Sequence, residues 1–84
     1  MQDMAEQTNP RLKKLHLEVV ENQLRNNDPP ITRITFDRLI SNGYTKAEAK
    51  ERIAAAVIGQ IYDMLRDGKS FNLEEYESEL NSIR

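Results

Sequence analysis

Apolar residues recur every three or four positions along most of this chain, which is the spacing of amphipathic α-helices. Short breaks rich in Pro, Gly and Asn divide the pattern into four stretches. These stretches predict helices at about residues 10–26, 29–42, 46–67 and 73–83. We therefore expect an all-α fold, a compact four-helix, bundle-like single domain over residues 9–84, with a flexible polar tail at residues 1–8.

The longest stretch predicts the central helix of this bundle. Thr45 and Glu48 have the spacing of a capping box at its start, and Gly68 supplies the left-handed residue that commonly ends a helix. At about 100° per residue, its apolar side chains cover an arc of roughly 200°. The arc contains Ile53, Ala54, Val57, Ile58, Ile61, Tyr62, Met64 and Leu65. An arc this wide predicts cover from two or three other helices.

The other helices carry their own end signals. Asp28 precedes two prolines and is expected to cap the second helix, which ends at Asn42-Gly43. Asn72 has Glu75 three residues later and is expected to cap the last helix, with Phe71 fixing its start against the core. The apolar residues expected to face inward are Leu12, Leu15, Leu17, Val19, Val20 and Leu24 in the first helix and Leu73, Tyr76, Leu80 and Ile83 in the last. Those of the second, Ile31, Ile34, Phe36, Leu39 and Ile40, form no clean stripe.

Three polar residues interrupt the apolar arc of the first helix. Gln23 is expected to hydrogen-bond backbone groups at a helix crossing, because a buried amide needs partners. His16 is the only histidine, and a lone histidine on an apolar face is typical of a core residue with one hydrogen bond. Lys13 is expected at the edge of the arc, where its amino group can reach water.

Composition excludes several classes of protein. Twelve Lys and Arg against 14 Asp and Glu give a net charge of -2, with no basic block to bind nucleic acid. The absence of Cys excludes disulfides and thiol catalysis and fits a cytoplasmic protein. The longest apolar run, residues 53–58, is far shorter than the roughly 20 residues that span a membrane. We expect neither a nucleic-acid nor a membrane partner.

The chain also lacks the motifs of common catalytic sites. It contains no Gly-rich phosphate loop, no HExxH and no serine nucleophile elbow, so we expect no cofactor and favour a non-enzymatic interaction or accessory protein. Ala55, Ala56 and Gly59 form a ridge of small residues on the central helix where a second helix could approach closely. This ridge predicts contact with a neighbouring helix or with a second subunit, as in a homodimer.

Four motifs follow one another along the chain: NPRLKKLHLEVVENQL, NNDPP, RL and NGYTKAEA. Together they resemble a bacterial family of small helical proteins of unknown function. The pattern of that family runs N-P-x-L-H-x-x-x-H-x-x-x-E-x-Q-L, then P-P, R-L and G-Y-[ST]-x-H-E-A-x-H. The matching residues are Asn9, Pro10, Leu12, Glu21, Gln23, Leu24, Pro29, Pro30, Arg38, Leu39, Gly43, Tyr44, Thr45, Glu48 and Ala49. The four histidines of the family are replaced by Lys13, Leu17, Ala47 and Glu51.

The resemblance raises a second functional hypothesis. Histidines and a glutamate that converge between two helices would form a metal site in the family. In this chain a metal-binding protein or metal-dependent enzyme would have to rely on His16, Glu21, Glu48 and Glu51, although Glu21 is better placed to pair with Arg25. If the family histidines do converge, Lys13 and Glu51 occupy the same space between the first and central helices. We therefore expect this cation and this carboxylate to approach each other.

Overall fold

The computed structural model describes residues 10–84 and contains four α-helices: α2 (Pro10–Asn26), α3 (Pro30–Ser41), α4 (Lys46–Asp67) and α5 (Leu73–Ser82). No strand occurs within these residues. The predicted all-α, four-helix, bundle-like fold is confirmed, and each helix ends within one residue of its expected position. The tail expected at residues 1–8 lies outside the described residues.

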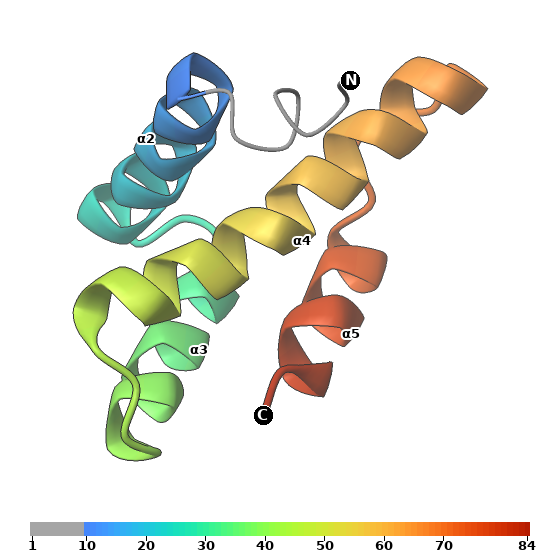
Figure 1. Ribbon diagram of the computed structural model, residues 1–84. Coiled ribbons are helices and arrows are strands. Elements are labelled where there is room, and N and C mark those ends of the chain that lie inside the picture. The colour runs from blue at the N-terminus through green and yellow to red at the C-terminus, as the bar shows by residue number, and fades with distance from the viewer. Residues whose placement is uncertain (1–9) are drawn as a thin grey trace.

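Helix α4 is the centre of the fold, as its length and wide apolar arc predicted. It packs against each of the other three helices, and α3 also contacts α2 and α5. Figure 1 shows α4 running diagonally across the molecule, with its C-terminal turns extending beyond α2 and α3 before the chain returns to α5. The centre of the core is therefore near the N-terminal half of α4, where the other helices meet it.

The start of α4 and the ends of three helices follow the local signals in the sequence. The Thr45 side chain accepts a hydrogen bond from the Glu48 N–H, and the Glu48 side chain accepts one from the Thr45 N–H, which completes the capping box. Gly68 ends α4 with a φ of 66°. Asn27 and Gly43 have positive φ and end α2 and α3 with the paired backbone hydrogen bonds of a Schellman motif.

The expected cap of α3 was wrong. Helix α3 begins at Pro30 with Pro29 in the N-cap position, and no side chain caps it. Because proline has no N–H, a proline near the start of a helix removes one of the donors that a cap would serve. The cap of α5 was predicted correctly, since Asn72 accepts a hydrogen bond from the Glu75 N–H. The Phe71 ring contacts Tyr76 edge to face with a centroid distance of 5.5 Å, which fixes the first turn of α5.

The core is smaller than the apolar pattern predicted. Its buried apolar residues are Val20, Leu24, Phe36, Leu39, Ala49, Ile53, Ala54, Val57, Tyr76 and Leu80. Thr32 and Thr35 are also buried, because α3 lies between α2, α4 and α5. By contrast Leu15 and Leu73 were expected to face inward and are exposed, and Ile34, which belonged to no clean stripe, is exposed as well. None of the described helices combines the length and the apolar character needed to cross a membrane.

Candidate functional site

Two ion pairs join α2 to α4. Lys13 Nζ lies 3.0 Å from Glu51 Oε2, and Lys50 Nζ lies 2.7 Å from Glu21 Oε2. Lys13 and Glu21 are separated by about 12 Å along α2, at 1.5 Å per residue, whereas Lys50 and Glu51 are neighbours. The two helices must therefore cross steeply instead of running side by side.

The ion pairs confirm one expectation and correct two others. Lys13 and Glu51 approach each other as predicted, but they lie at the rim of the interface, with 60% and 49% of their side chains exposed. Glu21 pairs with Lys50 and not primarily with Arg25, whose guanidinium binds the Asn22 side chain. The hydrogen bond from Lys50 is the main reason that the pKa of Glu21 lies below its ordinary value, and Arg25 adds a smaller electrostatic contribution.

The four candidate metal ligands do not form a cluster. Glu48 caps α4, Glu51 binds Lys13 and Glu21 binds Lys50, while His16 is half-buried on α2. Among residues 10–84, no three His, Asp or Glu side chains are arranged to hold a metal ion. The carboxylates are instead used in capping and in ion pairs with lysine.

Gln23 links three helices through side chains. Its Oε1 accepts hydrogen bonds from Tyr76 Oη at 2.8 Å and from Thr32 Oγ1 at 2.7 Å. The expected backbone partners were wrong, because two hydroxyl groups from α5 and α3 supply the donors. Burial raises the pKa of Tyr76, and the hydrogen bonds with Thr32 and Gln23 partly oppose that shift.

The small residues of α4 face two different directions. Ala55 is exposed, whereas Ala56 is half-buried and packs against the core. A Cβ atom on Gly59 would lie 3.9 Å from Glu79 Oε1, so Gly59 faces α5 at an ordinary contact distance. Of the three residues, Ala55 is the one that is open to a second molecule.

A row of larger apolar side chains continues from Ala55 toward the C-terminal end of α4. Ile58, Ile61, Tyr62 and Leu65 are all exposed, with Tyr62 at 63% and Leu65 at 80%. We call these four residues, together with Ala55, the α4 stripe. The expectation that this arc is covered by other helices was wrong in the C-terminal half of α4. Because α2 crosses α4 steeply near Lys50 and Glu51, it does not continue along the same face past Ile58.

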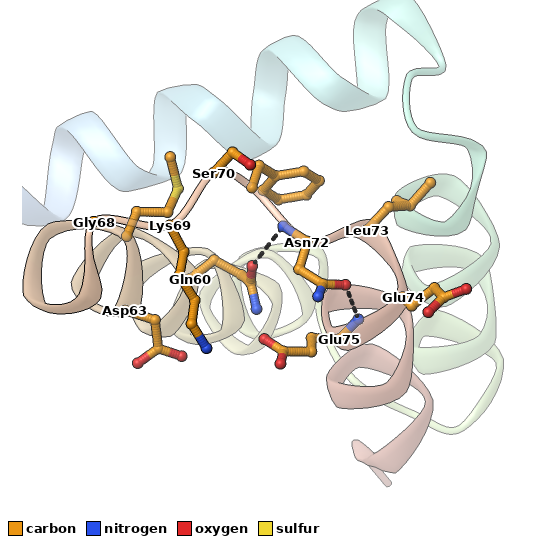
Figure 2. Close-up of a pocket in the computed structure, with 11 residues that line it drawn as sticks. Gln60, Asp63, Gly68, Lys69, Ser70, Asn72, Leu73, Glu74 and Glu75 are labelled. Carbon is orange, nitrogen blue, oxygen red and sulfur yellow. Dashed lines mark hydrogen bonds between the residues drawn. The ribbon is translucent and has the colours of Figure 1, made fainter.

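A second feature is an open cavity between the end of α4 and the start of α5, drawn in Figure 2. Its volume is about 700 Å³, and its lining includes Gln60, Asp63 and Glu75. Gln60 is only 3% exposed, and its Oε1 accepts a hydrogen bond from the Asn72 N–H at 3.3 Å. Its Nε2 is buried without an acceptor among the described residues. Sequence reasoning missed this cavity, because the helical pattern places Gln60 outside the apolar arc of the central helix and gives no sign that it is buried.

The electrostatics of this cavity are dominated by carboxylates. Asp63, Glu74 and Glu75 line it, with Lys69 as the cation among the lining residues. Figure 2 shows the Lys69 amino group between the Asp63 and Glu75 carboxylates in this view. Burial, followed by the charges of Asp63 and Glu75, raises the pKa of the neighbouring Glu79.

Comparison with family models, curated proteins and solved structures gives no match for this chain.

Proposed function

We propose that this protein is a non-enzymatic interaction domain that binds a second copy of itself through the α4 stripe. The observation that carries the proposal is the exposure of Ile58, Ile61, Tyr62 and Leu65 at positions i, i+3, i+4 and i+7 of one helix. This spacing is typical of a helix face that packs on another helix, and contiguous exposed apolar surface often marks an interaction site.

The stripe is complementary to itself. Ala55, Ile58, Tyr62 and Leu65 follow the alternating spacings of three and four that allow two helices to pack along their length. In an antiparallel pair with a two-fold axis at residue 60, Ala55 faces Leu65 of the other copy and Ile58 faces Tyr62. The small side chain of Ala55 then lies opposite the larger one of Leu65, which is favourable for close packing.

Gel filtration with light scattering tests this proposal directly. We expect a dimer mass at high micromolar concentration, and we expect Leu65→Glu to convert it to a monomer because the substitution buries an unpaired charge against the apolar side chains of the other copy. Leu15→Glu is the matched control, since Leu15 is also an exposed leucine but lies on α2. A monomer mass for the unmodified chain at high micromolar concentration would contradict the proposal.

Metal analysis of the purified protein distinguishes this proposal from the metal-binding hypothesis. An interaction domain needs no metal, and a titration with zinc, nickel and manganese should leave the melting temperature unchanged. Stoichiometric bound metal would argue for the alternative.

A further inference from the structure

The cavity between α4 and α5 combines two features. The first is an excess of negative charge, since Asp63, Glu74 and Glu75 line the cavity with Lys69 as the lining cation, and Arg66, outside the lining, pairs with Asp63. The second is the amide of Gln60, whose Nε2 is buried and lacks an acceptor in the described part of the chain. Buried donors are nearly always paired in folded proteins.

The orientation of the Gln60 amide follows from its neighbour. The Asn72 backbone nitrogen lies 3.3 Å from Gln60 Oε1. Because a backbone N–H can only donate, the amide oxygen of Gln60, and not its nitrogen, must face Asn72. The Nε2 group is then directed away from Asn72 N, and Figure 2 shows it on the side of the cavity where Glu75 lies. A group that satisfies Nε2 must be an acceptor, whereas a group that satisfies the carboxylates must be a cation.

We propose that this cavity binds a peptide segment of a partner protein through an arginine residue. A backbone carbonyl of the segment accepts the hydrogen bond from Gln60 Nε2, and the arginine guanidinium pairs with the carboxylates of Asp63 and Glu75. A single arginine residue in a peptide carries both groups, a carbonyl oxygen and a cation on a flexible stem.

The apolar lining favours arginine over a smaller cation. Met64, Phe71 and Leu73 are among the lining residues, and Phe71 and Leu73 are exposed. They can pack against the methylene groups of an arginine stem, and the Phe71 ring offers a face for the planar guanidinium. A volume of about 700 Å³ also leaves room for the peptide backbone on either side.

An anionic ligand is the main alternative, because Gln60 Nε2 and the Lys69 ammonium group are both donors. The surrounding carboxylates of Asp63, Glu74 and Glu75 would repel an anion, so the charge balance favours a cation. The two ligand classes differ in their response to Lys69. Removal of Lys69 should strengthen binding of a cation and weaken binding of an anion.

This inference goes beyond self-association and does not depend on it. Gln60, Asp63 and Met64 lie on the opposite side of α4 from Ile58, Tyr62 and Leu65, at about 100° per residue. A partner peptide in the cavity and a second copy on the α4 stripe would therefore occupy different faces.

A nuclear magnetic resonance titration of the full chain tests the proposal with two capped tripeptides. The first is acetyl-Gly-Arg-Gly-amide, and the second replaces arginine by citrulline, which has the same shape without the charge. We expect the arginine peptide to shift the backbone amide signals of residues 60–75 in a saturable manner, and the citrulline peptide to bind at least about threefold more weakly.

Substitutions in the cavity should change the affinity for the arginine peptide in a defined direction. Asp63→Asn and Glu75→Gln should each weaken binding by about two- to fivefold, as expected for a partly exposed ion pair. Lys69→Gln should strengthen binding by a similar factor. Glu77→Gln is the matched control, because it removes the same charge from α5 outside the cavity lining and should leave the affinity nearly unchanged.

Three outcomes would overturn the proposal. Equal binding of the two peptides would show that charge is not read, and weaker binding after Lys69→Gln would identify an anion site. Signal changes confined to residues 55–65 with no effect of Asp63→Asn or Glu75→Gln would place the peptide on the α4 stripe. Dimerisation is measured separately by light scattering, so failure of either proposal is distinguishable from failure of the other.

Discussion

Arg38 of α3 holds the carbonyl group of Leu80 at the end of α5, 42 residues later in the chain. The distance from Arg38 Nη2 to Leu80 O is 2.8 Å, and Nη1 of the same guanidinium donates to Ile83 O at 2.6 Å. The last carbonyl groups of a helix have no partner within the helix, and a cation is favourable at that end of the helix dipole. One side chain of α3 therefore caps the last helix of the fold.

Arg38→Met should destabilise the protein by about 1–3 kcal/mol, because two partly buried carbonyl groups lose charged donors. Arg38→Lys should recover only part of this loss, since one amino group cannot reproduce the two-pronged geometry of the guanidinium. Urea denaturation measures both changes, and hydrogen exchange at residues 80–84 should be faster in both variants. Arg25→Met on α2 is the control, because the Arg25 guanidinium donates to the exposed side chain of Asn22. An equal loss there would contradict the specific role of Arg38.

The hydrogen bonds of Gln23 predict an order of stabilities for two substitutions. Tyr76→Phe removes one hydroxyl and leaves Gln23 Oε1 with Thr32 as donor, so it should cost about 1 kcal/mol. Gln23→Leu removes the shared acceptor and leaves the buried hydroxyl groups of Thr32 and Tyr76 only their long contact of 3.4 Å with each other, so it should cost about 2 kcal/mol. Chemical denaturation of the two variants gives the comparison. If Tyr76→Phe lowers the free energy of unfolding more than Gln23→Leu does, the Gln23 amide is not the main partner in these hydrogen bonds.

The two ion pairs between α2 and α4 should differ in strength. Lys50 is the least exposed of the four partners, with 25% of its side chain accessible, so the Glu21–Lys50 pair is screened less by water than the Lys13–Glu51 pair. Double-mutant cycles with Met for Lys and Gln for Glu should give coupling energies of about 0.5–1 kcal/mol for the former and about 0.2–0.5 kcal/mol for the latter. A larger coupling energy for the Lys13–Glu51 pair would contradict this difference in exposure. A coupling energy that does not fall in 1 M salt would contradict the position of the two pairs at the surface.

The raised pKa of Glu79 predicts that this residue makes the fold less stable as the pH rises. A carboxylate in a stabilising ion pair has the opposite effect. The pKa of Glu79 is raised in the folded state by burial and by the charges of Asp63 and Glu75, so the ionised form of Glu79 destabilises the fold at neutral pH. Glu79→Gln should therefore increase the free energy of unfolding at pH 7, by no more than about 0.2–0.3 kcal/mol because Glu79 is exposed and water screens its interactions. The gain should disappear below the ordinary pKa of 4.5, where Glu79 is protonated in both states.

Thermal unfolding of the Glu79→Gln variant between pH 3 and pH 8 measures this dependence. Glu77→Gln serves as the control, because it removes a charge from the same helix. A variant that is destabilised at pH 7, or a gain that persists at pH 3, would show that Glu79 acts through packing and not through its charge.

The sequence by itself determined where the helices begin and end and which of them is central. The cap formed by Thr45 and Glu48, the left-handed Gly68 and the cap at Asn72 each depend on groups within a few residues, so the local sequence contains all the partners. The failure at Asp28 is also local, because two consecutive prolines changed the geometry in which a cap would act. The contact between Lys13 and Glu51 was predicted correctly from the resemblance to a helical family, whereas their exposure was not predicted.

Only the tertiary structure decided which part of each apolar face is buried. The periodicity of α4 is the same along its whole length, yet Ile53 is buried and Leu65 is exposed, because α2 crosses α4 at one point and leaves the next turns open. The partners of Gln23 and Gln60 likewise come from other segments of the chain, Tyr76 and Asn72, through contacts that helical periodicity does not encode. The α4 stripe and the cavity therefore arise from the angle at which helices cross, which is a property of the packed chain and not of any single helix.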